Sequence, residues 1–286
     1  MISNAWKVIE DLKNIKYQKP LIHNITNYVV MNNTANALLA IGASPVMAHA
    51  VEEVEDMVKI AAALAINIGT LSKPWIEAMR IAMNAAAKKN IPIIFDPVGI
   101  GATNYRNQTC AELLNLVTPT IIRGNPSEII TLAKILSPEK IETKNVNKEL
   151  KENQSKGVDS TEASDKAIDA AVAISQALGC VVSVSGEVDF IVQDTDINKV
   201  GNGNHLMPLV TGLGCTATSL TAAFAAVNES PFIAATNAMV VMGIAGEVAA
   251  EESIGPGTLQ TEFIDALYLL DEEQIVSRIK LTDRET

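Results

Sequence analysis

The feature that most constrains this fold is a series of short apolar runs that alternate with helix-like segments along the chain. Residues 63–70, 91–96 and 181–190 contain such runs, whereas residues 74–89 carry apolar side chains at helical spacing. Hydrophobic residues make up 48% of the chain and aromatic residues only 4%, which is typical of strands buried on both faces. The alternation predicts a single α/β domain over residues 1–286, with a largely parallel central sheet and helices on both of its faces.

Three stretches refine this prediction. Residues 138–157 are polar and rich in Lys, Glu and Asn, so we expect an exposed insertion there. Two short apolar runs within 189–203 predict an antiparallel hairpin near the edge of the sheet. The chain is expected to close with one or two amphipathic helices over 258–280.

A glycine-containing turn at residues 211–219 is the centre of the predicted site. Gly212 and Gly214 flank Leu213, Cys215 follows, and an apolar helix begins. Glycines let the backbone approach a ligand, and the first N–H groups of a helix have no partners inside it, so the turn is suited to a phosphate. A helix N-terminus also favours the thiolate of Cys215. The same pattern fits a plain turn that caps a buried helix, and locally the two interpretations are about equal.

Carboxylates follow two of the predicted strands. Asp96 ends an apolar run, and Glu128 begins a helix after the next strand. The carboxyl ends of parallel strands face the binding crevice, so both are candidates to hold Mg²⁺. Glu128 also fits a carboxylate favoured by the helix dipole alone, and Arg123 could bind a phosphate or pair with an acid. With Ser185 at another strand end, these are the parts that phosphoryl transfer needs.

Amide side chains cluster after the first predicted strand, within residues 24–27. Amides are costly to bury unless they bond to one another or to a ligand. We therefore favour a substrate-facing role for Asn24 over a role in a cap and turn, since α/β proteins bind ligands at strand ends. Met47 follows another short strand and, on this pattern alone, fits a core residue.

Charge and cysteine content narrow the class of function. The net charge is −11 and no basic stripe is present in the sequence, which argues against nucleic acid as a partner. The three cysteines are far apart, so neither a disulfide framework nor a zinc site is indicated, and a reducing, cytoplasmic compartment fits best. The N-terminus lacks a signal-peptide core and no apolar run reaches the length of a bilayer span, so no membrane partner is expected.

The sequence contains no Walker A motif, no protein-kinase motifs and no GxGxxG fingerprint. It does contain an ordered series of other motifs: Asn24-Ile25-Thr26-Asn27, Pro45-Val46-Met47, Asp96-Pro97-Val98-Gly99, Arg123-Gly124-Asn125-Pro126-Ser127-Glu128, Gly157-Val158-Asp159-Ser160, Ser185-Gly186-Glu187-Val188-Asp189 and Gly212-Leu213-Gly214-Cys215. This series resembles the hydroxyethylthiazole kinases of the ribokinase-like group over nearly the whole chain. The resemblance implies ATP- and Mg²⁺-dependent phosphorylation of 4-methyl-5-(2-hydroxyethyl)thiazole, a salvage step in thiamine biosynthesis. It also implies a homotrimer with active sites between subunits.

The resemblance assigns roles to individual residues. Met47, partly through its backbone, and Gly212 would contact the thiazole, and Arg123 and Ser185 would contact the phosphates of ATP. The remaining assignments concern catalysis and the metal: Asp96 and Glu128 would organise Mg²⁺, and Cys215 stands where most ribokinase-like enzymes have a catalytic Asp. A thiol is a poor general base unless its pKa is lowered, so we expect Cys215 to orient the substrate hydroxyl.

Two departures and two alternatives remain at this point. Leu213 and Ser185 stand where the family often has Thr, and the second change keeps the hydroxyl. One alternative is a related kinase acting on a hydroxymethylpyrimidine or a sugar, which an Asp at position 215 would have favoured. The other is a non-catalytic ligand-binding protein on the same scaffold, which the loss of Asp96 or Glu128 would have favoured.

Overall fold

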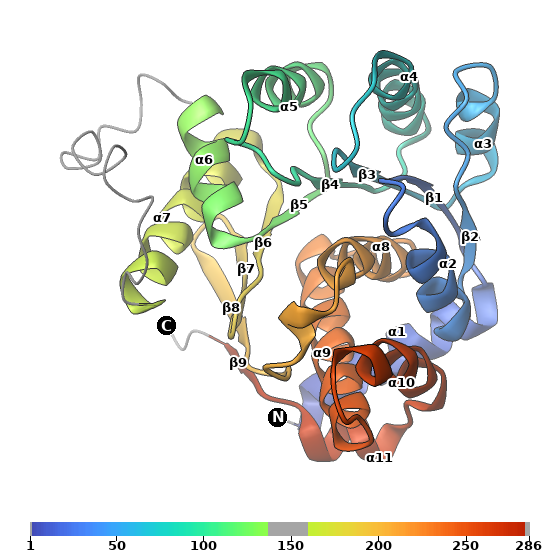
Figure 1. The fold of residues 1–286 in the computed structure, drawn as a ribbon, viewed down its shortest axis with the longest axis vertical. Coiled ribbons are helices and arrows are strands. Elements are labelled where there is room, and N and C mark those ends of the chain that lie inside the picture. The colour runs from blue at the N-terminus through green and yellow to red at the C-terminus, as the bar shows by residue number, and fades with distance from the viewer. Residues whose placement is uncertain (1, 137–159, 284–286) are drawn as a thin grey trace.

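A nine-stranded sheet runs through the part of the chain that the computed structural model describes, residues 2–136 and 160–283 (Figure 1). The strand order is β2-β1-β3-β4-β5-β6-β7-β8-β9. The strands from β2 to β6 are parallel, and β7, β8 and β9 are added antiparallel at one edge. Their bounds are β1 Leu21–Ile25, β2 Ser44–Val46, β3 Ala63–Asn67, β4 Ile93–Asp96, β5 Ile121–Gly124, β6 Val181–Val184, β7 Asp189–Gln193, β8 Asp196–Val200 and β9 Leu281–Asp283.

Helices cover both faces of this sheet (Figure 1). One layer consists of α3 Val54–Ile60, α4 Lys73–Lys89, α5 Asn104–Leu116, α6 Pro126–Leu136 and α7 Ser160–Leu178. The other consists of α1 Ile2–Gln18, α2 Met31–Ala40, α8 Leu213–Ala225, α9 Pro231–Glu251, α10 Pro256–Leu269 and α11 Glu272–Arg278, with a short 3-10 helix at Met207–Leu209. The sequence prediction of an α/β domain with a largely parallel, doubly covered sheet is confirmed.

The two helix layers enclose two hydrophobic cores because successive side chains of a strand point to opposite faces. On β3, Ala63 and Ala65 belong to the core under α8 and α9, whereas Leu64 and Ile66 belong to the core under α4. The small alanines on the first side let α8 pack directly against β1, β3 and β4. That close packing brings the N-terminus of α8 to the carboxyl edge of the sheet.

The predicted hairpin and closing helices are confirmed as β7–β8 and as α10 and α11. The sequence did not predict β9, which pairs with β8 after α11. The segment 138–157, expected to be an exposed insertion, lies outside the described residues.

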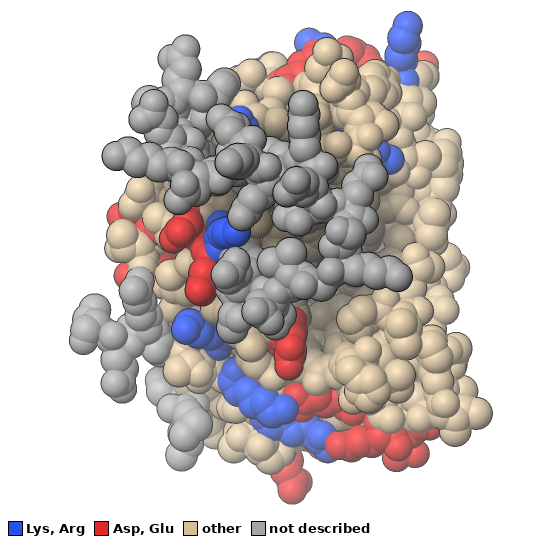
Figure 2. All heavy atoms as spheres, turned by 60° about the vertical axis from the view of Figure 1, so that its left-hand side comes forward, with Lys and Arg blue, Asp and Glu red and all other residues tan. Residues whose placement is uncertain are grey.

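On the face shown in Figure 2, basic and acidic side chains lie beside one another.

Helix α9 corrects one expectation. Its 21 residues are long and apolar enough to cross a bilayer by length and composition, although no such run was expected from the sequence. However, 78% of its most apolar window is buried inside the protein, against α1, α8, α10 and the sheet. Its apolar character is therefore that of a core helix, most of whose surface is covered by protein.

Candidate active site

The polar residues singled out in the sequence meet at the carboxyl edge of the parallel strands. Asp96 is the last residue of β4, Ser185 directly follows β6, and Glu128 lies in the first turn of α6 after β5. The N-terminus of α8 packs over β3 and β4 beside them. This is the edge at which α/β proteins bind ligands.

The turn before α8 depends on Gly212. Its φ is +89°, in the left-handed region, and a Cβ there would lie 2.6 Å from Cγ1 of Val30. The carbonyl of Gly212 accepts the first helical hydrogen bond, from the N–H of Thr216. Within the described residues, no side chain caps this helix end. The N–H groups of its first turn therefore have no side-chain partner in that part of the chain, and binding of an anion there stays a prediction.

Asp96 is almost fully buried at the end of β4. Its Oδ2 accepts hydrogen bonds from Oγ1 of Thr218 (2.7 Å) and from Nδ2 of Asn67 (2.9 Å). Burial raises the pKa of Asp96 to about 7, and the nearby Arg123 acts in the opposite direction. A further positive charge beside Asp96 would therefore lower this pKa and stabilise the carboxylate form.

Arg123 lies on β5 and is only 6% exposed. Its Nη1 donates to the carbonyl of Gly214 at 2.8 Å, so Arg123 helps to hold the first turn of α8 in place. Its Nε is buried and has no hydrogen-bond partner within the described residues. The Arg123 charge also acts on Asp189, whose pKa is raised to about 6 by burial and lowered in part by this guanidinium. A buried cation beside a helix N-terminus suits an anionic ligand.

Glu128 connects the loops that follow two neighbouring strands. Its Oε1 accepts from the N–H of Gly99 and its Oε2 from the N–H of Asn125, both at 2.8 Å. Its charge is one of the influences that raise the pKa of Asp96. Ser185 lies close by, with Oγ donating to the carbonyl of Gly124 at 3.3 Å.

Cys215 is half-buried in the first turn of α8, and its Sγ accepts from Nδ2 of Asn27 at 3.4 Å. Burial, and then the charge of Asp96, raise the pKa of its thiol to about 11. The expectation that the helix N-terminus favours the thiolate is therefore wrong for this environment. At neutral pH the side chain is a protonated thiol and not a general base.

The predicted substrate contacts lie in different surroundings. Met47 is half-buried after β2, and its carbonyl accepts from the ring of His49, which stacks on Trp75 with 4.0 Å between centroids. Asn24 is fully buried within β1, where its Oδ1 accepts from Ser219 and its Nδ2 donates to the carbonyl of Ile22. In this structure Asn24 joins β1 to α8, and a contact with substrate stays a prediction.

Three further side chains belong to the site and were not singled out as candidates in the sequence. Asn67, at the end of β3, bonds to both Asp96 and Asn27, and Thr218 bonds to Asp96 from α8. The signal for Asn67 was present, because a polar residue ends the apolar run of β3 as Asp96 ends that of β4. Asn27 belongs to the amide cluster after β1, and does not cap α2: that helix begins after Val30, and Oδ1 of Asn27 accepts from the N–H of Val29.

The donor set at this edge fits Mg²⁺. No group of three or more His, Cys, Asp or Glu side chains able to hold a metal occurs among residues 2–136 and 160–283. Asp96 and Glu128 nevertheless supply two carboxylates near enough that the charge of Glu128 raises the pKa of Asp96, beside the uncapped N-terminus of α8. Mg²⁺ is usually held by one or two carboxylates together with water and substrate phosphates, so this set is compatible with it.

The fold places this chain in the class of proteins with the ribokinase-like fold. A solved structure described as pyridoxal kinase from Staphylococcus aureus in complex with AMP-PCP and pyridoxal matches with a TM-score of 0.60, covering 92% of this chain and 99% of that chain. Its sequence identity is 14%, so the likeness concerns the fold alone.

The family follows from closer matches. The profile of the hydroxyethylthiazole kinase family matches residues 12–273. A hydroxyethylthiazole kinase of Syntrophus aciditrophicus is 55% identical over 278 residues, 97% of this chain and 96% of that relative. A solved structure described as a hydroxyethylthiazole kinase protein from Pyrococcus horikoshii OT3 is 38% identical, with a TM-score of 0.85 and coverage of 97% and 99%. The chain belongs to the hydroxyethylthiazole kinase family, as its motifs predicted.

Proposed function

We propose that this protein transfers the γ-phosphoryl group of ATP to the hydroxyl of 4-methyl-5-(2-hydroxyethyl)thiazole, giving the thiazole phosphate used in thiamine biosynthesis. The observation that carries this proposal is the uncapped N-terminus of α8 beside Asp96 and Arg123, in a chain of this family. Neither Asp96 nor Glu128 is lost, which speaks against a non-catalytic protein on the scaffold.

In this reaction the substrate oxygen forms a bond to the γ-phosphorus, the bond to the bridging oxygen of ADP breaks, and the hydroxyl proton passes to solvent. The transition state of such transfers is loose, with charge spread over the moving phosphoryl group. Catalysis then consists mainly of positioning and of donors aimed at that charge. The first-turn N–H groups of α8 supply such donors, and Arg123 and Ser185 are proposed to contact the phosphates of ATP.

Asp96 and Glu128 are proposed to hold Mg²⁺. When bound, Mg²⁺ offsets the charge of the phosphate oxygens that it contacts. Glu128 also fixes the loops after β4 and β5 through its two hydrogen bonds, so it defines the shape of the edge.

Cys215 is proposed to orient the substrate hydroxyl and not to remove its proton. A thiol with a pKa of about 11 carries almost no negative charge at neutral pH. On this view Cys215→Ala keeps part of its turnover, because the N–H groups of α8 remain. Complete loss of turnover with normal binding of both substrates would show that Cys215 takes a direct part in the chemistry.

For the thiazole itself we propose contacts from Met47, Gly212 and Asn24. Aromatic side chains lie near Met47: His49 stacks on Trp75, and Tyr28 meets Trp75 edge-on with 4.8 Å between centroids. Aromatic side chains of this kind can stack against a flat aromatic ligand such as the thiazole ring. Asn24 is fully buried, and its Oδ1 accepts a hydrogen bond from Ser219 of α8. A direct contact with the thiazole therefore needs a small shift of the Asn24 side chain. Otherwise Asn24 acts on the substrate indirectly, by holding Ser219 in place.

We further propose a cytoplasmic homotrimer with active sites between subunits. Tyr28 and Val29 directly follow the site residue Asn27 and are 63% and 65% exposed. Apolar side chains exposed beside a polar site suit coverage by a second copy.

The test of the activity is release of ADP from MgATP with hydroxyethylthiazole, with hydroxymethylpyrimidine and ribose as parallel acceptors. We expect turnover with the thiazole alone. Turnover with one of the other acceptors alone would mean that the substrate assignment is wrong. Binding of the thiazole without release of ADP would mean that the catalytic assignment is wrong.

A further inference from the structure

Asn67 is the residue from which this inference starts. Its side chain lies at the end of β3, is only 2% exposed, and bonds at both ends. Nδ2 donates to Oδ2 of Asp96 at 2.9 Å, while Oδ1 accepts from Nδ2 of Asn27 at 3.0 Å and from the N–H of Gly69 at 2.9 Å. A rotated amide would place its NH₂ group against two donors, so these partners fix the orientation of Asn67.

Asn27 continues this connection to α8. Its Nδ2 reaches Sγ of Cys215, and its own orientation is fixed because Oδ1 accepts from the N–H of Val29. Gly69 leaves the space that Asn27 occupies, since a Cβ on Gly69 would lie 2.7 Å from that amide nitrogen.

The bonds close into a ring through α8. Thr218 lies three residues after Cys215, on the same side of the helix, and donates to the same oxygen of Asp96 that Asn67 contacts. The ring therefore consists of Asp96, Asn67, Asn27, Cys215 and Thr218. It joins the ends of β3 and β4 and the loop after β1 to the first turns of α8.

We propose that Asn67 is a positioning residue for phosphoryl transfer, holding Asp96 and the Asn27–Cys215 pair in one register so that the N-terminus of α8 faces the metal-binding carboxylate. The proposal rests on the proposed function and deepens it. Asn67 acts through its neighbours, and a change there is expected to alter the rate of the bound complex more than the binding of either substrate.

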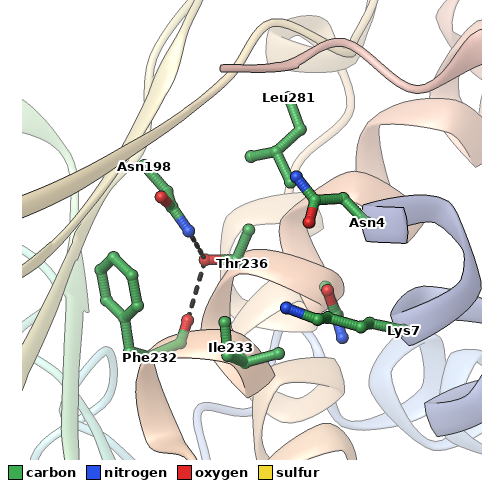
Figure 3. Close-up of a pocket in the computed structure, with 8 residues that line it drawn as sticks. Asn4, Lys7, Asn198, Phe232, Ile233, Thr236 and Leu281 are labelled. Carbon is green, nitrogen blue, oxygen red and sulfur yellow. Dashed lines mark hydrogen bonds between the residues drawn. The ribbon is translucent and has the colours of Figure 1, made fainter. Parts of the chain in front are cut away.

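The first experiment compares Asn67→Ala with a matched control, Asn198→Ala. Asn198 is also a buried strand amide, 8% exposed, but it lies on β8 in a separate pocket of about 170 Å³ (Figure 3). There its Nδ2 donates to Oγ1 of Thr236 at 3.1 Å, and two strands separate β8 from β5. Each variant thus removes one buried amide of the same kind.

For Asn67→Ala we expect kcat to fall roughly 100-fold, the effect of a misplacement of about 1 Å, with KM for ATP and for the thiazole changed less than threefold. Asn198→Ala should keep kcat within twofold. Asn67→Ser, a smaller change whose hydroxyl cannot span both partners, should lose kcat at least tenfold. Normal kcat in either Asn67 variant, or an equal loss in Asn198→Ala, would overturn the proposal.

A double-mutant cycle gives an independent readout. If Asn67 works through Asn27, the variant Asn27→Ala/Asn67→Ala should lose far less activity than the product of the two single losses. The pair Asn67→Ala/Asn198→Ala should lose that product. Multiplication in the first pair would refute the connection. The wild type must turn over the thiazole in the same assay; its failure to do so would count against the proposed function and not against the ring.

Discussion

At the scale of single residues, the site depends on one backbone conformation and one buried network. Gly212 sets the direction in which α8 begins, and Asp96 collects hydrogen bonds from β3 and α8. The sequence could predict the glycine turn and the place of Asp96 at a strand end, because a glycine before a helix and a carboxylate after an apolar run are local patterns. It could not predict that Asn67 and Asn27 would meet, because 40 residues separate them and only the parallel pairing of β1 with β3 brings them together.

Gly212→Ala is expected to impair both stability and activity. The left-handed φ costs a non-glycine residue about 1 kcal/mol, and the contact with Val30 adds to it. We expect a lower free energy of unfolding in urea and a kcat at least tenfold lower, because the N–H groups of α8 are turned away.

Gly255→Ala is the matched control for that variant. Gly255 precedes α10 as Gly212 precedes α8, but its φ of 172° is extended and an added Cβ meets no atom within 4 Å among the described residues. Equal effects of the two substitutions would contradict the role assigned to the turn.

The thiol of Cys215 makes a prediction about pH. With a pKa of about 11, its thiolate fraction rises about tenfold per pH unit across the range in which an ordinary thiol, with a pKa near 8.5, levels off. Alkylation of the folded protein by iodoacetamide should therefore still be accelerating at pH 9.5.

Mass spectrometry of the alkylated peptides identifies the reacting thiol. Cys110 and Cys180 are buried, and burial raises the pKa of each to about 12, so they should react after Cys215. Cys215→Ala provides the background rate. A rate that levels off below pH 9 would mean that the thiol is more acidic than this environment allows.

At the scale of elements, the alternation of strands and helices was readable because apolar period and length are local properties. Two features, strand β9 and the start of α2, could not be predicted in this way. β9 has three residues and exists because it pairs with β8, and the start of α2 uses no side-chain cap among the described residues. In both cases tertiary contacts decided what local propensity left open. The apolar length of α9 is likewise hard to read from the sequence, because Gly243, Gly246 and polar residues interrupt the apolar run.

Helix α1 provides a prediction at this scale. Its Asp11 is 4% exposed and bonds to Nδ2 of Asn228, and to Nδ2 of Asn237 on α9 at 2.7 Å. Asp11→Ala leaves both amides without this partner and should lower the free energy of unfolding by about 2 kcal/mol. Urea titration measures this change, and Glu10→Ala, on the exposed side of α1, should leave it within about 0.5 kcal/mol. Similar values for the two variants would show that Asp11 does not anchor the helix.

At the scale of the whole molecule, the proposed trimer predicts a particle three times the chain mass of 30.5 kDa in sedimentation equilibrium. Val29→Arg should weaken the assembly and raise KM for the thiazole, because a charge would be placed on the apolar surface beside the site. Tyr17 is an exposed residue near the end of α1, before the amino end of β1, whereas the site lies at the carboxyl ends of the strands. Tyr17→Arg should therefore leave the mass of the assembly unchanged. A wild-type mass equal to one chain would refute the trimer.

The packing of α9 also has a consequence for how the protein is made. The ribosome completes α1 first, yet α1 packs against α9 and α11, which are made in the last fifth of the chain. Until then one face of the growing sheet lacks its central helix, and the nascent chain displays apolar surface that chaperones bind. Early termination of translation would leave a product that cannot bury this surface, so quality control has a clear signal to remove it.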